Sequence, residues 1–139
     1  MAYLPLTLPA PAPTMDERPF WDNCAQRRLT FQRCTDCGRF CHPPIPVCPH
    51  CQSTRRQWDD APETGEIYTY TVVHHPAHPD IGPHLPYNVV VVAFPECDGV
   101  RLVSNVIDVP PDELQVGLRV RLAWEAHGEG VYLPRFRRA

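Results

Sequence analysis

The chain contains no lysine, and its 13 basic residues are all arginines set against 16 acids, which gives a formal charge of −3. A protein that binds a phosphate backbone by electrostatic attraction needs an excess of positive charge. No stretch approaches the roughly 18 apolar residues of a membrane span, and the first residues lack the basic start and apolar core of a signal peptide. These absences disfavour nucleic acid and predict a cytoplasmic protein with no membrane segment.

The signatures of common catalysts are also missing. The sequence has no glycine-rich phosphate loop, no nucleophile elbow and no spaced pair of carboxylates. Cys24 and Cys97 lie outside any pattern of a cysteine activated by a base. His74 and His78 have the spacing of two metal ligands on a helix, but the prolines around them exclude a helix there. The sequence therefore predicts that the chain is not an enzyme by itself.

Proline is abundant, with 18 residues, roughly twice average usage. Four of them fall in residues 1–13 and predict an extended arm, either a free tail or a strap laid on a partner. Residues 14–30 contain a helix from about Arg18 or Pro19 to Arg28. Residues 31–60 hold the clustered cysteines, and the following "APETG" marks a boundary before residues 61–139.

The last part of the chain alternates β-branched with polar residues. Five strands are expected over residues 65–75, 87–94, 99–108, 118–127 and 130–136. A turn or one-turn helix in "VPPDELQVG" stands where an OB-fold places its connecting helix. The predicted fold is mainly β, with an N-terminal helix, a zinc ribbon and a five-stranded OB-fold barrel. The proline-rich loop 76–86 is either a binding loop or a cover for the barrel.

Four cysteines form a C-x2-C-x10-C-x2-C pattern in which two tight turns would supply a tetrahedron of thiolates. The predicted ligands are Cys34, Cys37, Cys48 and Cys51. Four thiolates saturate Zn²⁺, so the metal would be structural; iron and disulfides are the alternatives, and a reducing cytosol disfavours disulfides. Cys41, His42 and His50 are competing ligands. Gly38 suits a left-handed turn, whereas Gln52 at the equivalent position predicts a less regular second turn.

With these features in view, the chain resembles a family of bacterial and archaeal proteins that pair a rubredoxin-like zinc ribbon with an acyl-CoA-associated OB-fold. The resemblance covers about residues 16–138. It is carried by the order and spacing of "FWDNCAQRRLTFQRCTDCG", "PVCPHC", "TGEIYTYTVVHHP", "PY", "RLVSN", "VG" and "LPRF". The resemblance implies a non-catalytic subunit in a hetero-oligomer with a thiolase-fold or lipid-transfer-protein-type enzyme, including the aldolases of steroid side-chain breakdown.

The same resemblance implies a surface that meets a CoA thioester or the partner enzyme. The residues it singles out are His75, Tyr87, Asn105, Arg135 and Phe136. An arginine near the C-terminus would also suit CoA phosphates, because guanidinium groups make bidentate contacts with phosphate. The alternative function is binding of single-stranded nucleic acid, with Tyr68, Tyr70 and Tyr87 stacking on bases.

Overall fold

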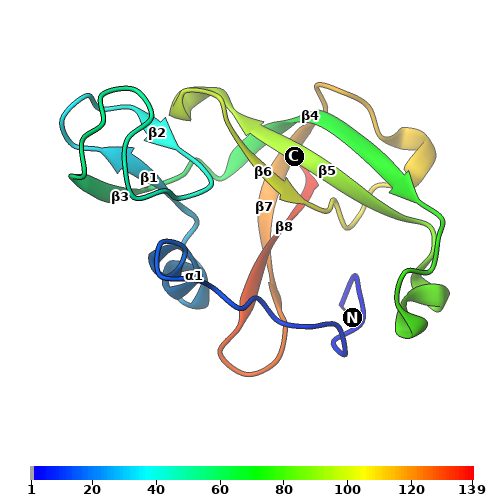
Figure 1. Ribbon diagram of the computed structural model, residues 1–139. Coiled ribbons are helices and arrows are strands. Elements are labelled where there is room, and N and C mark those ends of the chain that lie inside the picture. The colour runs from blue at the N-terminus through cyan, green and yellow to red at the C-terminus, as the bar shows by residue number, and fades with distance from the viewer. Residues whose placement is uncertain (1) are drawn as a thin grey trace.

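The computed structural model describes residues 2–139 as two small sheets joined through one core (Figure 1). The helices and strands are α1 (Arg18–Ala25), β1 (Thr30–Cys34), β2 (Phe40–Cys41), β3 (Arg56–Asp60), β4 (Thr64–Val73), β5 (Tyr87–Phe94), β6 (Val100–Ser104), β7 (Arg119–Ala126) and β8 (Tyr132–Arg138), with short 3₁₀ turns at Pro79–His84, Pro95–Cys97 and Pro111–Glu113. The predicted fold class is confirmed. No helix within residues 2–139 is both long and apolar enough to cross a membrane.

The helix α1 begins where the sequence predicts and ends earlier than expected. Proline is tolerated in the first turn, where backbone N–H groups have no partner in the helix, so Pro19 fits the start. Arg27 has a φ of 57°, a left-handed conformation that ends the helix before Arg28. The helix buries Phe20 and Cys24.

The first sheet has the order β2-β1-β3, with β1 in the centre and both neighbours antiparallel to it. Gln32 lies on β1 opposite Cys41 on one side and Trp58 on the other. Its side-chain amide donates to the carbonyl of Ile45 at 2.9 Å and accepts from the Ile45 N–H at 3.1 Å. This pair of bonds fixes the loop between the two cysteine pairs to the sheet.

The second sheet has the order β6-β5-β4-β7-β8 and curls on itself. A parallel bridge between Val106 and Phe136 joins its two ends, with Ile107 N–H donating to the Phe136 carbonyl at 2.8 Å. The third predicted strand therefore stops at Ser104 instead of continuing to residue 108, because the chain leaves β5 there to meet β8. The five predicted strands are all present.

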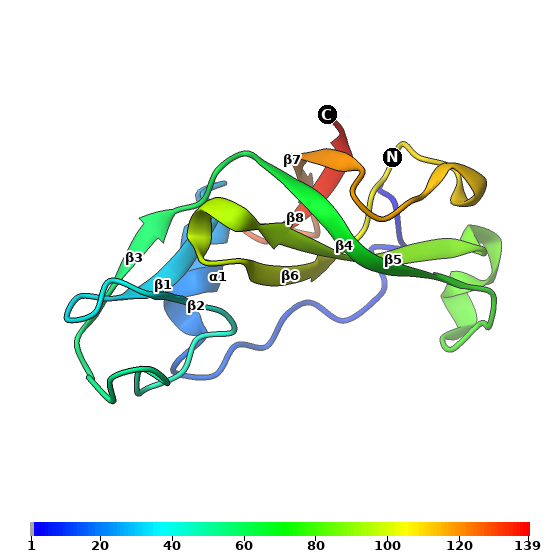
Figure 2. The ribbon, with the colours of Figure 1, turned by 90° about the horizontal axis from the view of Figure 1, so that it is seen from above.

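Gly65 lies where β4 passes from its partner β5 to its partner β7. A Cβ atom at this position would lie 2.7 Å from Cγ1 of Val92 and 2.8 Å from the carbonyl oxygen of Ala93. Only glycine allows the strand to bend this closely over β5. Figure 2 shows the resulting sweep of β4 from the ribbon end of the molecule to the far end of the barrel.

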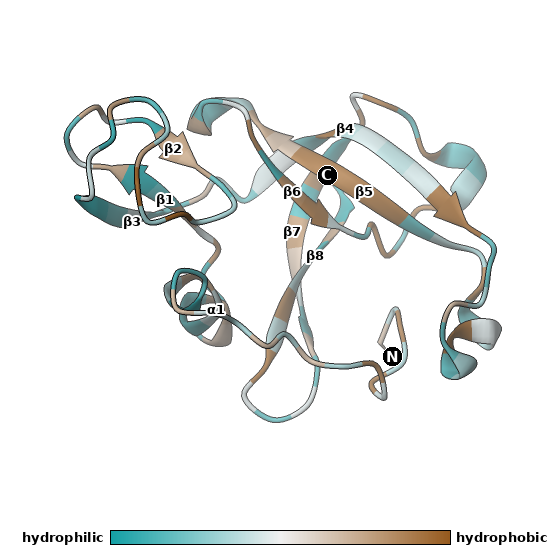
Figure 3. Cartoon of the chain, in the orientation of Figure 1, coloured by the Kyte–Doolittle hydropathy of each residue, from teal (hydrophilic) through white to brown (hydrophobic). Residues whose placement is uncertain are grey.

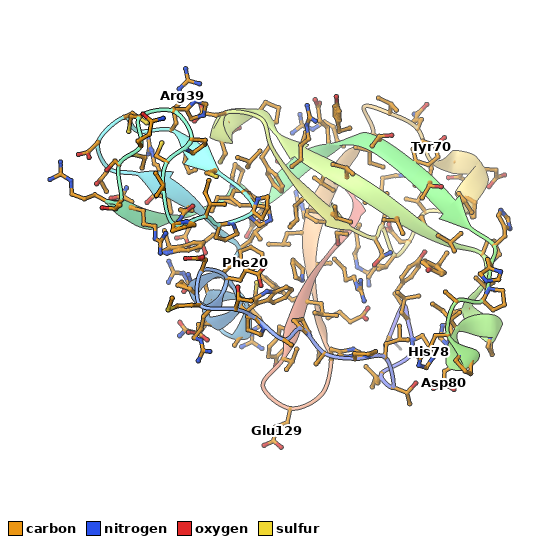
Figure 4. The ribbon with its side chains drawn as sticks, in the orientation of Figure 1. Phe20, Arg39, Tyr70, His78, Asp80 and Glu129 are labelled. Atoms are coloured by element: carbon orange, nitrogen blue, oxygen red, sulfur yellow. The ribbon has the colours of Figure 1, made fainter. Side chains whose placement is uncertain are left out.

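A row of aromatic rings joins the helix, the ribbon and the barrel into one core. Ring centroids are 5.1 Å apart for Phe20 and His42, 5.2 Å for His42 and Phe31, 5.1 Å for Phe31 and Phe94, and 6.2 Å for Phe94 and Phe136. Phe20 points from α1 toward this junction in Figure 4, and the apolar strand β5 lies beside it in Figure 3. Ribbon and barrel therefore share their hydrophobic core.

Candidate metal centre and barrel-end site

The sulfur cluster, formed by Cys34, Cys37, Cys48 and Cys51, has the geometry of a tetrahedral metal site. All four sulfur atoms lie within 4.8 Å of one another. The Sγ atoms of Cys34 and Cys51 are 3.6 Å apart and those of Cys37 and Cys48 are 3.7 Å apart. A tetrahedron with Zn–S bonds of about 2.3 Å has edges of about 3.8 Å. The residues therefore fit Zn²⁺, and the chain carries the four-cysteine cluster of a zinc ribbon.

The two turns that present the sulfurs are built alike. The N–H of Cys34 donates to the Arg39 carbonyl and the N–H of Cys48 to the Ser53 carbonyl, both at 2.9 Å. Gly38 and Gln52, each four residues after a first cysteine, donate back to that cysteine's carbonyl, again at 2.9 Å. Their φ values of 76° and 61° are both left-handed. The prediction of a less regular second turn was wrong, because Gln52 adopts the strained conformation that glycine adopts freely.

The thiols of the sulfur cluster have pKa values shifted in opposite directions. A hydrogen bond from the Cys37 backbone N–H, assisted by neighbouring donors, lowers the pKa of Cys34 to about 6. The backbone N–H of Ser53 is the largest influence on Cys51 and acts in the same direction, but the contacts with Cys34, Cys37 and Cys48 together with desolvation outweigh it, and the pKa of Cys51 rises to about 12. Metal binding requires all four groups as thiolates, so filling the site releases protons.

The competing ligands lie outside the cluster. Cys41 donates to the Pro43 carbonyl at 3.5 Å, and burial raises the pKa of its thiol. His42 points into the core, where burial lowers its pKa to about 4. His50 is exposed. Among residues 2–139, the four-cysteine set is the only group of three or more potential ligand side chains that the structure brings together.

The residues predicted to meet a ligand or partner are divided between surface and interior. His75 is exposed and Tyr87, the first residue of β5, is half-buried. Asn105 is 5% exposed and Phe136 is 0% exposed. Phe136 therefore offers no surface to a ligand, because it closes the barrel and packs on Phe94. The predicted contact of its side chain with acyl-CoA does not fit this position.

A hollow of about 340 Å³ opens between α1, the ribbon, β6 and β8. Trp21, His42 and Leu133 supply apolar and aromatic walls, and Arg135 and Arg101 supply positive charge. The side chain of Arg135 is 12% exposed, and its Nε atom lies 3.6 Å from the Glu125 carboxylate. We call this hollow the groove. Its combination of apolar walls with a few fixed charges is the usual character of a small-molecule site.

The three tyrosines do not form one stacking surface. The register of β4 shifts between Ile67 and Thr69, so Tyr68 lies at a bulge. Arg101 stacks on Tyr68 at 3.7 Å, whereas Tyr70 pairs with Val90 across β4 and β5, although its own side chain is 37% exposed. Consecutive bases would need aromatic rings on one face. This arrangement disfavours the predicted alternative of single-stranded nucleic acid.

The sequence matches two family models of the same protein. Residues 21–55 match the model described as "ChsH2, rubredoxin-like zinc ribbon domain", and residues 58–125 match "ChsH2, C-terminal OB-fold domain". The chain is also similar to a solved structure described as "Ltp2-ChsH2(DUF35) aldolase", with 40% identity, a TM-score of 0.84, and coverage of 92% of this chain and 98% of that chain. A Sulfolobus solfataricus structure of a DUF35 protein of unknown function shares the fold at 16% identity and a TM-score of 0.63, over 90% of this chain and 86% of that chain.

Two curated relatives extend this comparison. A Thermomonospora curvata protein named "Probable enoyl-CoA hydratase alpha subunit" is 41% identical over 133 residues, covering 94% of this chain and 40% of that protein. The chain thus spans two fifths of that relative's length. A Methanothermobacter thermautotrophicus "DUF35 domain-containing scaffold protein" is 28% identical over 106 residues, covering 75% of this chain and 77% of that protein.

A cysteine-built zinc ribbon followed by a curled five-stranded OB-fold defines the class of this protein. Within that class, the chain belongs to the ChsH2 (DUF35) family. The resemblance predicted from the sequence is confirmed.

Proposed function

We propose that the chain is a non-catalytic, zinc-binding subunit that scaffolds a thiolase-like acyl-CoA enzyme and helps to hold its thioester substrate. The observation that carries this proposal is the similarity to the ChsH2 chain of the Ltp2-ChsH2(DUF35) aldolase, which extends over 98% of that chain. The names of the T. curvata and M. thermautotrophicus relatives support an acyl-CoA enzyme and a scaffolding role respectively. The partner would be a thiolase-fold or lipid-transfer-protein-type enzyme of lipid or steroid side-chain breakdown in the cytoplasm.

The chemistry of the described residues supports placing the reaction on the partner. Four thiolates leave a bound Zn²⁺ no open position for water or substrate. Burial raises the pKa of Cys24 to about 12, and it also raises the pKa of Cys97, so neither thiol is an activated nucleophile. The chain's contribution would then be shape and charge, provided where the partner and the thioester meet it.

The groove is the site that we assign to the thioester. Its apolar walls suit an acyl or pantetheine chain, and Arg101 lies at the rim, where it would meet a phosphate. Val103 stands on the same rim and is 66% exposed, which is unusual for an aliphatic residue in a strand. Together with Tyr68, which is 42% exposed beside Arg101, it forms an apolar rim suited to a partner surface.

The test begins with an affinity-tagged chain produced in its native host. We expect a larger thiolase-fold or lipid-transfer-protein-type enzyme to copurify in fixed stoichiometry and to be identified by mass spectrometry. The purified zinc-loaded chain alone should not turn over acyl-CoA, and the reconstituted complex should. Turnover by the chain alone, or purification without any enzyme partner, would refute the proposal.

A matched pair of substitutions locates the surface. Val103→Glu places a charge on the groove rim, and Val116→Glu places the same charge at a residue 67% exposed that does not line the groove. We expect Val103→Glu to reduce recovery of the partner at least tenfold, since burying an unpaired charge costs several kcal/mol. Val116→Glu should copurify normally. Equal recovery of the partner with both variants would exclude the groove rim as the contact surface.

A further inference from the structure

The N-terminal arm, residues 2–14, lies on the chain's own barrel, whereas the sequence predicted a free tail or a strap on a partner. It runs from α1 to the far end of the barrel, where the N-terminus lies (Figures 1 and 2). Polar contacts of its backbone fix it there at two residues. The backbone of Tyr3 contacts Glu125 and His84, and the carbonyl of Leu8 is hydrogen-bonded to Nε2 of His127 at 2.8 Å. His127 is 8% exposed, so this anchor is a buried one.

Tyr3 uses all of its polar groups in this position. Its hydroxyl accepts hydrogen bonds from the backbone N–H and the side-chain amide of Asn88, both at 2.9 Å. Its own N–H donates to the Glu125 carboxylate at 3.0 Å, and its carbonyl lies 3.2 Å from Nδ1 of His84. The backbone N–H, the carbonyl and the hydroxyl oxygen of Tyr3 thus each have a specific polar partner, which non-specific packing of the segment would not provide.

These contacts join a set of polar groups that we call the barrel-end network, in which the Nε of Arg135 and one carboxylate oxygen of Glu125 are buried without a hydrogen-bond partner. Asn88, which is 2% exposed, accepts a hydrogen bond from Asn105 through its carbonyl. The side-chain oxygen of Asn105 accepts a hydrogen bond from Arg135, whose Nε faces the carboxylate of Glu125. The same carboxylate accepts a hydrogen bond from the N–H of Tyr3. The network is therefore a built site, and the phenol of Tyr3 is the group that fills it. Burial raises the pKa of that phenol, which keeps it neutral.

We propose that the barrel end is a recognition site for an extended, tyrosine-bearing peptide segment, occupied in the free chain by its own arm and able to bind such a segment in trans. The phenol slot supplies specificity, because a ring without a hydroxyl leaves the donors of Asn88 unsatisfied. The bonds to backbone groups at Tyr3 and Leu8 select an extended chain, and prolines in the segment reduce the entropy lost on binding.

The arm is an intramolecular competitor for this site. A short tethered segment has an effective concentration in the millimolar range, so a free peptide competes poorly with an intact arm. Weakening the arm at Tyr3 should therefore open the site to a peptide of the same sequence. Asn105 and Arg135, two of the residues predicted to meet a ligand or partner, belong to the same network, since Asn105 donates to Asn88 and accepts from Arg135.

The test uses the full-length, zinc-loaded chain and a fluorescent peptide of residues 2–14, followed by anisotropy. We expect the peptide to bind the Tyr3→Ala chain at least tenfold more tightly than the wild-type chain. Leu6→Ala, in the same arm at a residue 57% exposed, is the control and should behave as wild type. A peptide carrying Tyr3→Phe should bind the Tyr3→Ala chain about tenfold more weakly. Equal binding by all three chains, no binding by any, or indifference to the hydroxyl would overturn the proposal.

Hydrogen exchange gives a second readout that needs no added peptide. The N–H of Asn88 should exchange at least tenfold faster in the full-length Tyr3→Phe chain than in the wild type, because its acceptor is removed. The Leu6→Ala chain should leave that rate unchanged. Unchanged protection of Asn88 in Tyr3→Phe would show that the arm does not occupy the site in solution, and would likewise overturn the proposal.

Discussion

Replacing His42 by phenylalanine is expected to remove part of the acid sensitivity of folding. The ring of His42 lies between Phe20 and Phe31, and its Nδ1 atom is buried without a hydrogen-bond partner. Burial lowers the pKa of this histidine from 6.5 to about 4, although the nearby charge of Glu17 acts in the opposite direction. The protein must therefore hold the ring neutral in a place where a charge has no partner.

Proton linkage gives the sign and the size of the expected change in the free energy of unfolding with pH. The folded pKa lies below the unfolded one, so the unfolded chain binds more protons between pH 6.5 and about pH 4, and stability falls as the pH falls through that window. With these two pKa values, lowering the pH from about 7 to about 5.5 costs about 1.2 kcal/mol of the free energy of unfolding. At lower pH, protonation of the sulfur cluster would release the metal, and the resulting loss of stability would add to the effect of His42.

Urea unfolding of the zinc-loaded chain at both pH values measures this difference. The wild type should lose about 1.2 kcal/mol more than His42→Phe, which keeps an aromatic ring in the row but does not titrate. His75→Phe, at an exposed histidine, should retain the wild-type sensitivity. If wild type and His42→Phe lose equal stability, the buried histidine is not the source of the pH dependence, and the account of its environment is wrong.

Three further changes probe the metal and the packing. Phe31→Ala should lower the free energy of unfolding by about 3–5 kcal/mol in denaturant unfolding, since the ring is fully buried; a loss below about 1 kcal/mol would contradict the shared core. Cys48→Ser should abolish stoichiometric zinc in elemental analysis and lower the melting temperature of the whole chain; full zinc retention would exclude Cys48 as a ligand. Gly65→Ala should destabilise the barrel by about 1–3 kcal/mol in the same denaturant assay, because its Cβ would overlap Val92. Gly82→Ala, where a Cβ meets no atom within 4 Å, is the control and should be nearly neutral. Equal effects of the two substitutions would refute the close approach of Gly65 to β5.

Local signals in the sequence were sufficient for the ribbon and the strands. The spacing of the cysteine pairs identifies the sulfur cluster because each pair closes its own turn, so no distant contact is needed. The run of β-branched residues along β5 and the alternation along β7 predict strands for the same reason. The bulge at Tyr68 was not predictable, because it depends on how β4 leaves β5 for β7, and it changes which tyrosines share a face.

The contacts between distant segments are what the sequence did not reveal. The family resemblance placed Phe136 where a ligand or partner would approach, but Phe136 is buried because its strand closes the barrel against Val106. The arm was predicted to be a free tail or a strap on a partner, because prolines only exclude a helix and do not say where an extended chain lies. Tyr3 is separated from Asn88 by 85 positions, and no local pattern marks that pair. The one usable signal was a lone aromatic residue near the start of a stretch that otherwise consists mainly of proline, leucine and alanine.

The aromatic row also determines how this polypeptide can be divided. A fragment that begins at residue 61 would carry every strand of the barrel but would present Phe94 to water where Phe31 now packs. A fragment that stops at residue 60 would leave Phe31 without the ring of Phe94. The boundary between the two matched regions is therefore not a boundary between two folding units, and cutting the chain at that point should yield two halves with exposed apolar surface.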